Sequence, residues 1–135
     1  MKTIAFGTLK GGTGKTTVAF NIGGILAEDK KVLFIDVDPQ SNLSDNAGID
    51  TADQSGPTIR DVFEHPTQVK AETVITKAPI EQLPNLDIIA GHIRLTATEF
   101  QMVAQAGRER VLQKWIDRNR DVLEQYVVIF KYLLL

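Results

Sequence analysis

The chain has 135 residues, of which 43% are hydrophobic and 24% charged, with a formal net charge of −2; this composition indicates a globular protein with a buried core. It contains no cysteine, which excludes disulfides, thiolate metal sites and iron–sulfur clusters. The small net charge gives no overall field that would attract nucleic acid or lipid. With no secretory signal and no apolar stretch near the roughly 20 residues that span a bilayer, we expect one cytoplasmic domain over residues 1–135, without membrane contact.

A glycine-rich loop joins the first two predicted elements, a strand over residues 2–8 and a helix from residue 16 to about residue 29. The loop ends in Gly14-Lys15-Thr16, as phosphate-binding loops do, but Leu9 stands where such a loop has its first glycine. It also carries an additional lysine, Lys10. The residues that we expect to hold phosphates are Gly11, Gly12, Thr13, Gly14, Lys15, Thr16 and Thr17.

Each part of this loop has a chemical role in binding phosphate. Glycines let backbone N–H groups turn inward and form a concave anion site, and the following helix adds unpaired N–H groups and the positive end of its dipole. Lys15 would reach the β- and γ-phosphates, Thr16 would place its hydroxyl beside Mg²⁺, and Thr17 would donate to the α-phosphate. The alternative is a glycine-rich hairpin without a ligand, which the order of strand, glycines, lysine, threonines and helix disfavours.

The predicted helix has an unusual composition. Four apolar residues keep helical spacing: Val18, Ile22, Ile25 and Leu26. Gly23 and Gly24 lower its intrinsic helix propensity. Their presence suggests that this helix packs closely on a sheet.

An acidic turn follows the second predicted strand. The continuous apolar run at residues 32–35 is typical of a parallel strand covered on both faces. It leads into residues 36–42, Asp-Val-Asp-Pro-Gln-Ser-Asn, and the strand–helix–strand order places this turn at the same sheet edge as the phosphate loop. There Asp36 would hold Mg²⁺ through its water shell, and Asp38 would orient or polarise an attacking water. The alternative is an ordinary acidic turn after a strand.

Shorter elements fill the middle of the chain. We expect a loop or short helical turn at residues 44–56, a short helix at 58–64 capped by Thr58, an edge strand at 74–76 and a further strand at 86–90. Two histidines are expected in surface or structural positions rather than as ligands: His65 and His92.

The last part of the chain is mostly helical and basic. Residues 94–119 predict helix with a break at Gly107, and residues 126–129 predict a buried strand. Its basic residues are Arg108, Arg110, Lys114, Arg118 and Arg120, which we interpret as a solvated helix face rather than a contact surface for DNA or a partner.

The apolar ending at residues 130–135 would extend a strand or expose an adhesive surface. Together the elements predict an α/β fold with a mostly parallel twisted sheet flanked by helices.

Two motifs resemble those of a known family. Residues 10–17, Lys-Gly-Gly-Thr-Gly-Lys-Thr-Thr, resemble the deviant Walker A motif of the ParA/MinD family of ATPases. Residues 36–42 resemble the second motif of that family in its ParA/Soj form, and residues 93–95 and 107–110 also look like ParA. The resemblance extends over nearly the whole chain and implies a P-loop NTPase-like fold.

The resemblance also implies residue roles, cofactors and partners. Lys10 resembles the signature lysine that reaches the partner's nucleotide in an ATP-sandwich dimer, and Asp38 resembles the residue needed for hydrolysis. With Lys15 these are the implied catalytic residues, while Thr16 and Asp36 are the implied magnesium residues. The implied function is that of a Mg²⁺-dependent ATPase in plasmid or chromosome partitioning. Such ATPases bind ATP or ADP, form a nucleotide-dependent homodimer, bind DNA without sequence preference and respond to a centromere-binding ParB-like protein.

The resemblance breaks near the end of the chain. Family members are longer and place a Walker B aspartate directly after the strand that matches residues 126–129, where this chain has Phe130. The chain therefore resembles the N-terminal part of a ParA protein, cut or frame-shifted near Phe130, with an incomplete sheet. A nucleotide-binding or interaction module without turnover is the second hypothesis. A P-loop enzyme that phosphorylates a small molecule is the third, which Lys10 and residues 36–42 disfavour.

Overall fold

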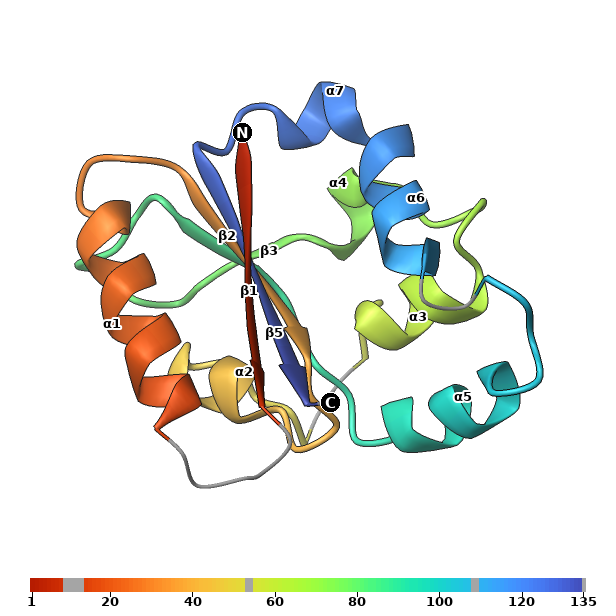
Figure 1. The fold of residues 1–135 in the computed structure, drawn as a ribbon. Coiled ribbons are helices and arrows are strands. Elements are labelled where there is room, and N and C mark those ends of the chain that lie inside the picture. Colours follow the sequence, from red (N-terminus) through yellow and green to blue (C-terminus); the bar gives the residue numbers. More distant parts are fainter. Residues whose placement is uncertain (9–13, 53–54, 108–109, 135) are drawn as a thin grey trace.

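One five-stranded sheet organises the molecule (Figure 1). The computed structural model describes residues 1–8, 14–52, 55–107 and 110–134. The strands lie in the order β1-β5-β2-β4-β3, and their bounds are β1 Lys2–Thr8, β2 Val32–Val37, β3 Thr76–Lys77, β4 Leu86–Ile89 and β5 Val128–Leu134. Strands β1, β5, β2 and β4 run parallel, and β3 pairs antiparallel with β4 at one edge. The predicted mostly parallel α/β sheet is confirmed.

Helices cover both faces of the sheet (Figure 1). One face carries α1 (Lys15–Ala27) and α2 (Asn42–Asn46). The other carries the remaining helices, which are α3 (Ile59–Glu64), α4 (Ala71–Val74), α5 (Leu95–Met102), α6 (Val111–Arg118) and α7 (Arg120–Leu123). Strand β1 lies at the edge opposite β3.

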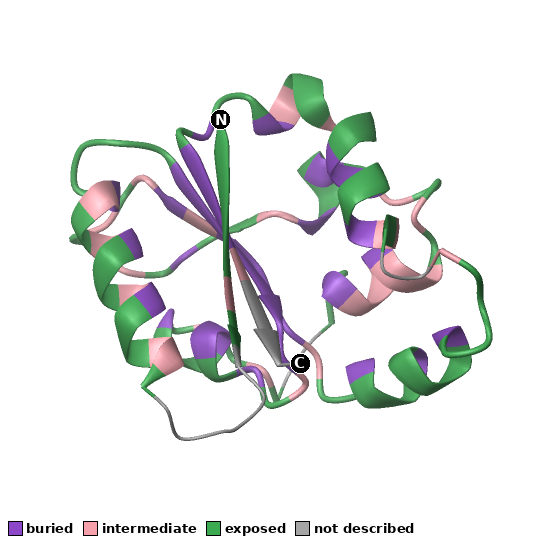
Figure 2. Ribbon diagram, in the orientation of Figure 1, coloured by how far each residue is buried: buried purple, intermediate pink, exposed green. Residues whose placement is uncertain are grey.

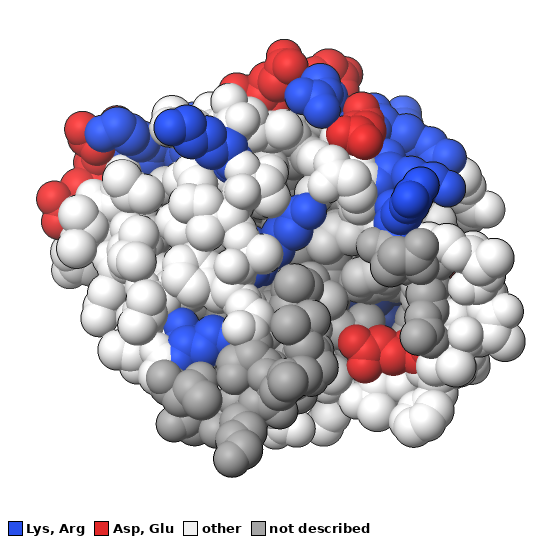
Figure 3. All heavy atoms as spheres, in the orientation of Figure 1, with Lys and Arg blue, Asp and Glu red and all other residues white. Residues whose placement is uncertain are grey.

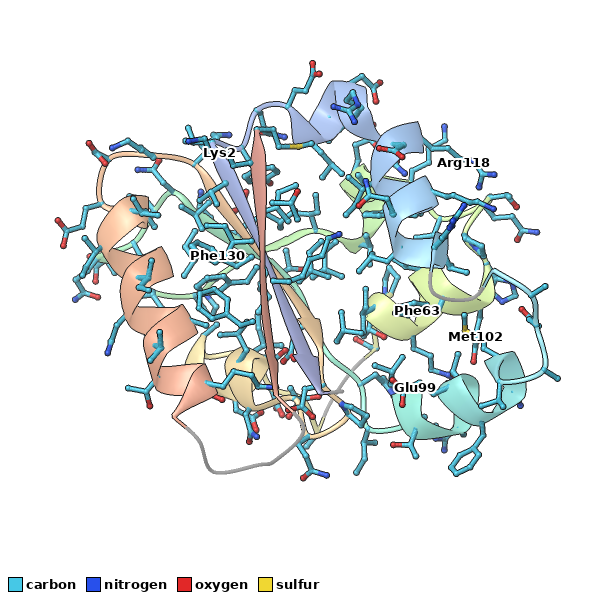
Figure 4. All side chains as sticks on the ribbon, in the orientation of Figure 1. Lys2, Phe63, Glu99, Met102, Arg118 and Phe130 are labelled. Atoms are coloured by element: carbon cyan, nitrogen blue, oxygen red, sulfur yellow. The ribbon has the colours of Figure 1, made fainter. Side chains whose placement is uncertain are left out.

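The last strand occupies the middle of the sheet rather than its edge. Strand β5 pairs with β1 on one side and β2 on the other, so the apolar ending of the chain extends a strand. Phe130 lies inside it, fully buried on the α1 face (Figure 4), with ring centroids 5.3 Å from Phe6 and 5.7 Å from Phe34. The strand predicted at residues 126–129 begins two residues before β5 and ends five residues before Leu134, so its bounds were wrong at both ends.

The face under α3 to α7 holds a core of large side chains. Trp115 is completely buried and its indole N–H donates to the carbonyl oxygen of Val69 at 2.7 Å. Helix α6 buries Leu112, Trp115 and Ile116, while Lys114 and Arg118 are exposed on its other side. Helix α6 therefore has an apolar buried side and a charged exposed side, which agrees with the solvated basic face predicted for this segment.

The opposite face packs through small residues. Helix α1 buries Ala19, Gly23 and Ala27, and a Cβ atom at Gly23 would lie 2.2 Å from Cε1 of Phe34. The close approach that the glycine pair predicted is thus confirmed at Gly23. Of the predicted apolar stripe, Leu26 is partly buried and packs against the core. The other three residues are exposed, by 49% for Val18, 42% for Ile22 and 67% for Ile25.

Other local predictions had mixed outcomes. Thr58 caps α3 as predicted, since its hydroxyl accepts from the N–H of Arg60 at 3.3 Å and its own N–H donates to Asp61 at 2.7 Å. Gly107, with φ of 80°, lies in the break between α5 and α6. The predicted edge strand was wrong for Val74, which belongs to α4, and β3 begins at Thr76. Among the described residues, no helix is long and apolar enough to cross a membrane.

Candidate phosphate and magnesium site

Three chain segments meet at the carboxyl edge of the parallel strands. They are the beginning of α1 at Gly14, the turn after β2 and the segment after β4, and this edge is where open α/β sheets bind ligands. The predicted catalytic residue Lys10 and the predicted phosphate-binding residues Gly11, Gly12 and Thr13 lie outside the described residues. Gly14 to Thr17 are described and form the beginning of α1.

The first turn of α1 is set by Gly14. This residue has φ of 77° and ψ of 9°, in the left-handed region where L side chains are strained. Its carbonyl oxygen accepts from the N–H of Val18 at 3.0 Å, so the helix begins at Lys15. Because the first N–H groups of a helix lack intrahelical partners, they and the helix dipole favour an anion at this point.

Lys15 stands in the field of two carboxylates. Partial burial lowers the pKa of its ammonium group, and the negative charges of Asp38 and Asp36 act in the opposite direction. The structure thus brings together Lys15, at the start of α1, and the two aspartates of the acidic turn, as expected if both segments share one sheet edge. Thr16 is half-buried and Thr17 is exposed in the same helical turn.

Asp36 is completely buried and hydrogen-bonded through both oxygens. Its Oδ1 accepts from the N–H of Asp38 at 3.1 Å, and its Oδ2 accepts from the N–H and the hydroxyl of Ser44 at 2.9 and 2.7 Å. Burial raises the pKa of the Asp36 carboxyl to about 6, against the opposing effect of these hydrogen bonds. The group therefore titrates near the physiological range.

A short relay connects Asp36 to the end of β4. The N–H of Gly91 donates to Oγ of Ser44 at 2.9 Å, and that hydroxyl in turn donates to Asp36. A Cβ atom at Gly91 would lie 2.7 Å from Oγ of Ser41 and 3.1 Å from Cγ of Asp36, so only glycine fits this close approach. Ser44 and Gly91 were not predicted from the sequence as site residues; the one local signal for them is a glycine directly after a predicted strand.

The turn that follows holds Asp38 in a fixed position. Oδ1 of Asp38 accepts from the N–H of Gln40 at 2.9 Å, its carbonyl oxygen accepts from the N–H of Ser41 at 2.8 Å, and the residue is 3% exposed. Such a turn fixes the direction of the carboxylate relative to the end of β2.

Glu99 of α5 is a further acidic residue near this turn. Its pKa is raised by partial burial and by the negative charge of Asp38, and it lies at the end of the molecule where the parallel strands terminate (Figure 4). Glu99 was not predicted from the sequence, because its distance of 61 residues from Asp38 along the chain leaves no local signal. No group of three His, Cys, Asp or Glu side chains in the described part of the chain is placed to hold a metal by itself, so a cation here would need oxygens from a ligand or water.

Ser41 contributes an unusual polar atom. It has φ of 56° and ψ of 29°, is 3% exposed, and its hydroxyl has no hydrogen-bond partner among the described residues. A buried hydroxyl without a partner is uncommon and calls for an ordered water or a ligand. The hydroxyl of Ser41 and the buried carboxylate of Asp36 both lie close to Gly91, and together they suit a hydrated divalent cation. The beginning of α1 and Lys15 suit a phosphate bound to that cation.

The sequence matches a known family. A protein-family model described as an AAA domain (AAA_31) matches residues 1–130. The sporulation initiation inhibitor protein Soj of Bacillus subtilis is 33% identical over 129 residues, which are 95% of this chain and 48% of that protein. The chromosome partitioning protein ParA of Caulobacter vibrioides is 36% identical over 125 residues, which are 92% of this chain and 42% of that protein. The chain thus spans less than half the length of these two relatives.

Solved structures have the same fold. The McdA protein of Cyanothece, in its ATP complex, superposes with a TM-score of 0.84 at 27% identity, over 99% of this chain and 48% of that chain. Cobyrinic acid a,c-diamide synthase of Mycobacterium smegmatis, with a bound ATP analogue and magnesium, gives a TM-score of 0.84 at 23% identity, over 99% of this chain and 51% of that chain; at that identity the likeness concerns the fold.

Proposed function

The chain belongs to the AAA domain family and is related to the ParA and Soj partitioning ATPases, and on this basis we propose that it binds ATP with Mg²⁺ at the carboxyl edge of its sheet. The observation that carries the proposal is the meeting of Lys15, at the beginning of α1, with the buried Asp36 and Asp38. A helix terminus with a lysine suits the phosphates, and two carboxylates suit a hydrated cation.

Residue roles follow from this placement. Lys15 would bind the β- and γ-phosphates, Thr16 would contact Mg²⁺, and Thr17 would donate to the α-phosphate, with Gly11, Gly12, Thr13 and Gly14 supplying backbone N–H groups. Lys10 would act on the nucleotide of the partner in a nucleotide-dependent dimer. These last assignments to residues 10–13 rest on the sequence motif.

The acidic residues would serve the metal and the water. Because Asp36 is fully buried and already accepts three hydrogen bonds, it suits a role through the water shell of Mg²⁺ rather than direct ligation. Bound Mg²⁺ would neutralise phosphate charge and orient the triphosphate. Asp38, held by the N–H of Gln40, would orient the attacking water, and the orphan hydroxyl of Ser41 would hold a water of the same shell.

In the cell this activity would serve partitioning of a plasmid or chromosome. Relatives carry the names chromosome partitioning protein ParA and chromosome-partitioning ATPase Soj. We extend to this chain the switch between a monomer and an ATP-bound dimer, binding to non-specific DNA, and stimulation by a centromere-binding ParB-like protein.

A second candidate function is nucleotide binding without turnover. Its support is Phe130, which stands where the resemblance places the Walker B aspartate and is buried between Phe6 and Phe34. A phenyl ring there supplies no carboxylate to the metal, so hydrolysis would depend on Asp36 and Asp38 alone.

Calorimetric titration with Mg²⁺·ATP beside a phosphate-release assay tests both candidates. The wild type should bind ATP, and Lys15→Ala should weaken binding by roughly 10- to 100-fold, because a charged hydrogen-bond donor is lost. Lys10→Ala should leave monomer binding intact and weaken the nucleotide-dependent dimer. Lys30→Ala is the matched control, since that exposed lysine pairs with Asp29 beyond the other end of α1.

The outcomes separate the two functions. ATP binding with phosphate release supports the ATPase, and binding without release supports the module without turnover. Equal ATP affinity in the wild type and Lys15→Ala would refute both.

A further inference from the structure

Ser41 combines two unfavourable features in one buried residue. It is the one residue other than glycine with a positive φ in the part of the chain that the structure describes, and such a backbone strains an L side chain. Its hydroxyl is also the one buried side-chain polar atom in those residues without a hydrogen-bond partner. Each feature lowers the stability of the folded state, and glycine at this position would remove both. The stability of the free protein therefore does not explain the serine.

The backbone of Ser41 is held in this conformation from both sides. Its N–H donates to the carbonyl oxygen of Asp38 at 2.8 Å, and its carbonyl oxygen accepts from the N–H of Asp45 at 2.9 Å. The second bond begins α2, which is buried at Leu43 and Ser44; Figure 2 shows this short helix, with buried residues in it, at the carboxyl end of the sheet. Because both backbone groups are already bonded, the hydroxyl is the part of Ser41 that remains for a ligand.

The hydroxyl shares its surroundings with the buried carboxylate of Asp36. A Cβ atom at Gly91 would lie 2.7 Å from Oγ of Ser41 and 3.1 Å from Oδ2 of Asp36, so both oxygens lie beside the same point of the chain. The carboxylate already accepts three hydrogen bonds, from Asp38 and Ser44, whereas the hydroxyl oxygen can still accept two. Residues of this chain enclose the position, because Ser41 is 3% exposed.

These two oxygens suit an ion that keeps its water. No group of three His, Cys, Asp or Glu side chains in the described part of the chain could hold a bare metal ion. Mg²⁺ loses water reluctantly and usually keeps several waters when it binds, whereas Ca²⁺ takes carboxylate and carbonyl oxygens directly and in flexible geometry. A water on a cation donates hydrogen bonds, which a hydroxyl oxygen and a carboxylate can accept.

The charges around this position are divided as a magnesium–nucleotide pair requires. Figure 3 shows basic side chains over the beginning of α1 and acidic side chains near α5, both at the end of the molecule where the parallel strands terminate. Lys15 and Glu99 are charged residues of these two helices, and both lie in the field of Asp38. The basic side suits the phosphates and the acidic side suits the cation.

We propose that Ser41 makes the nucleotide site selective for hydrated Mg²⁺ over Ca²⁺, because its hydroxyl accepts a hydrogen bond from a water that the ion keeps. The inference rests on the proposed function of the chain. Ser41 is a positioning residue in this role, since it acts on the ion through that water. The hydroxyl is enclosed in the free protein, so contact with the water requires it to rotate about the Cα–Cβ bond. The serine thus lowers the stability of the free protein and gains its partner when the magnesium nucleotide binds.

Two substitutions separate the hydroxyl from the backbone. Ser41→Gly and Ser41→Ala both remove the hydroxyl, but only glycine also suits φ of 56°. Calorimetric titration with a non-hydrolysable ATP analogue, once with Mg²⁺ and once with Ca²⁺, measures the selectivity without turnover. Both variants should lose roughly 5- to 10-fold in affinity for the magnesium complex, because one hydrogen bond is lost. They should lose less than about twofold for the calcium complex, which does not depend on a retained water.

Chemical denaturation without nucleotide gives a second, independent readout. The denaturation midpoint of Ser41→Gly should lie above that of the wild type, because both unfavourable features are removed. Ser41→Ala should lie between them, because it keeps the strained backbone. Ser55→Ala is the matched control, since Ser55 is exposed and precedes α3, and it should change neither the ion selectivity nor the midpoint.

The outcomes distinguish this inference from the proposed function. Lower affinity for the magnesium complex alone, in both Ser41 variants, with a higher midpoint for Ser41→Gly, supports the inference. Equal losses with Mg²⁺ and Ca²⁺ would mean that the hydroxyl contacts the nucleotide, and unchanged affinities would leave it a structural role; each overturns the inference, as does a midpoint of Ser41→Gly below that of the wild type. A wild type that binds neither complex would refute the proposed function itself, and this inference with it.

Discussion

The two faces of the sheet differ in how their helices meet it. On one face, α6 turns Trp115 and Ile116 inward and Lys114 outward. On the other, α1 turns Gly23 inward and Ile25 outward. Both segments have apolar residues at helical spacing, yet one stripe is buried and the other is exposed. The difference shows that side-chain size on the sheet side, here the space left by Phe34, decides which side of a helix is buried.

The largest expected effect is on the small-residue contact of α1. Gly23→Ala would place a Cβ atom 2.2 Å from the Phe34 ring, and we expect it to lower the free energy of unfolding by about 3 kcal/mol through overpacking. Chemical denaturation measures this loss. Alanine otherwise favours helix, so propensity alone predicts a gain.

Gly24→Ala is the matched control for that substitution. Its Cβ atom would lie 3.7 Å from Leu83, an ordinary contact, and we expect a gain of about 0.5 to 1 kcal/mol from helix propensity. If both substitutions stabilise the protein, α1 does not approach the sheet as closely as described.

Local patterns predicted much of the fold, and long-range contacts account for most of what they missed. The order of strands and helices, the cap at Thr58 and the solvated charged side of α6 follow from the spacing of residues close in sequence. The central position of β5 depends on pairing with β1 and β2, more than 90 residues away. The gathering of Lys15 with Asp36 and Asp38 was foreseen from the strand–helix–strand order, whereas Glu99 joins them through the packing of α5.

The next effect concerns pH and the buried carboxyl of Asp36, which accepts hydrogen bonds from Ser44 of α2. Asp36 has a pKa of about 6 in the folded protein against 3.8 as its ordinary value, so between these values the folded state binds a proton that the unfolded state releases. Stability from this group is full below pH 3.8 and is lost as pH rises through 6. We expect the contribution of Asp36 to the free energy of unfolding to fall by about 2 to 3 kcal/mol as the pH rises over this interval.

Chemical denaturation of the wild type and of Asp36→Asn at several pH values from about 4 to about 7 tests whether the pKa of Asp36 is raised in the folded protein. In Asp36→Asn, the free energy of unfolding should not show the decrease with rising pH that Asp36 causes in the wild type. Parallel pH profiles of the wild type and the variant would show that Asp36 titrates normally and is not buried as described.

A smaller effect is expected on the α3 side of the sheet. Thr58→Ala removes the hydroxyl that accepts from the N–H of Arg60, and the loss of this cap should lower the free energy of unfolding by about 1 kcal/mol. Thr96→Ala, at an exposed position on α5, serves as the control and should change little. Equal effects of the two substitutions would argue against the cap.

The smallest expected effect concerns the exposed side of α1, in contrast to the buried side of α6. Ile25→Ser, at a residue 67% exposed on the outer side of α1, should change the free energy of unfolding by less than about 0.5 kcal/mol. Ile116→Ser, at a residue 1% exposed on α6, should destabilise strongly. A large loss of stability on substitution of Ile25 would mean that α1 is rotated relative to the sheet.

Amide hydrogen exchange with and without Mg²⁺·ATP tests the proposed nucleotide site, because it reports where on the chain the nucleotide binds. We expect slower exchange in the first turn of α1, from Lys15 to Ala19, and in the turn from Asp38 to Ser41, with no change in α6. Nucleotide binding that leaves both turns unprotected, or protection confined to another part of the molecule, would contradict it.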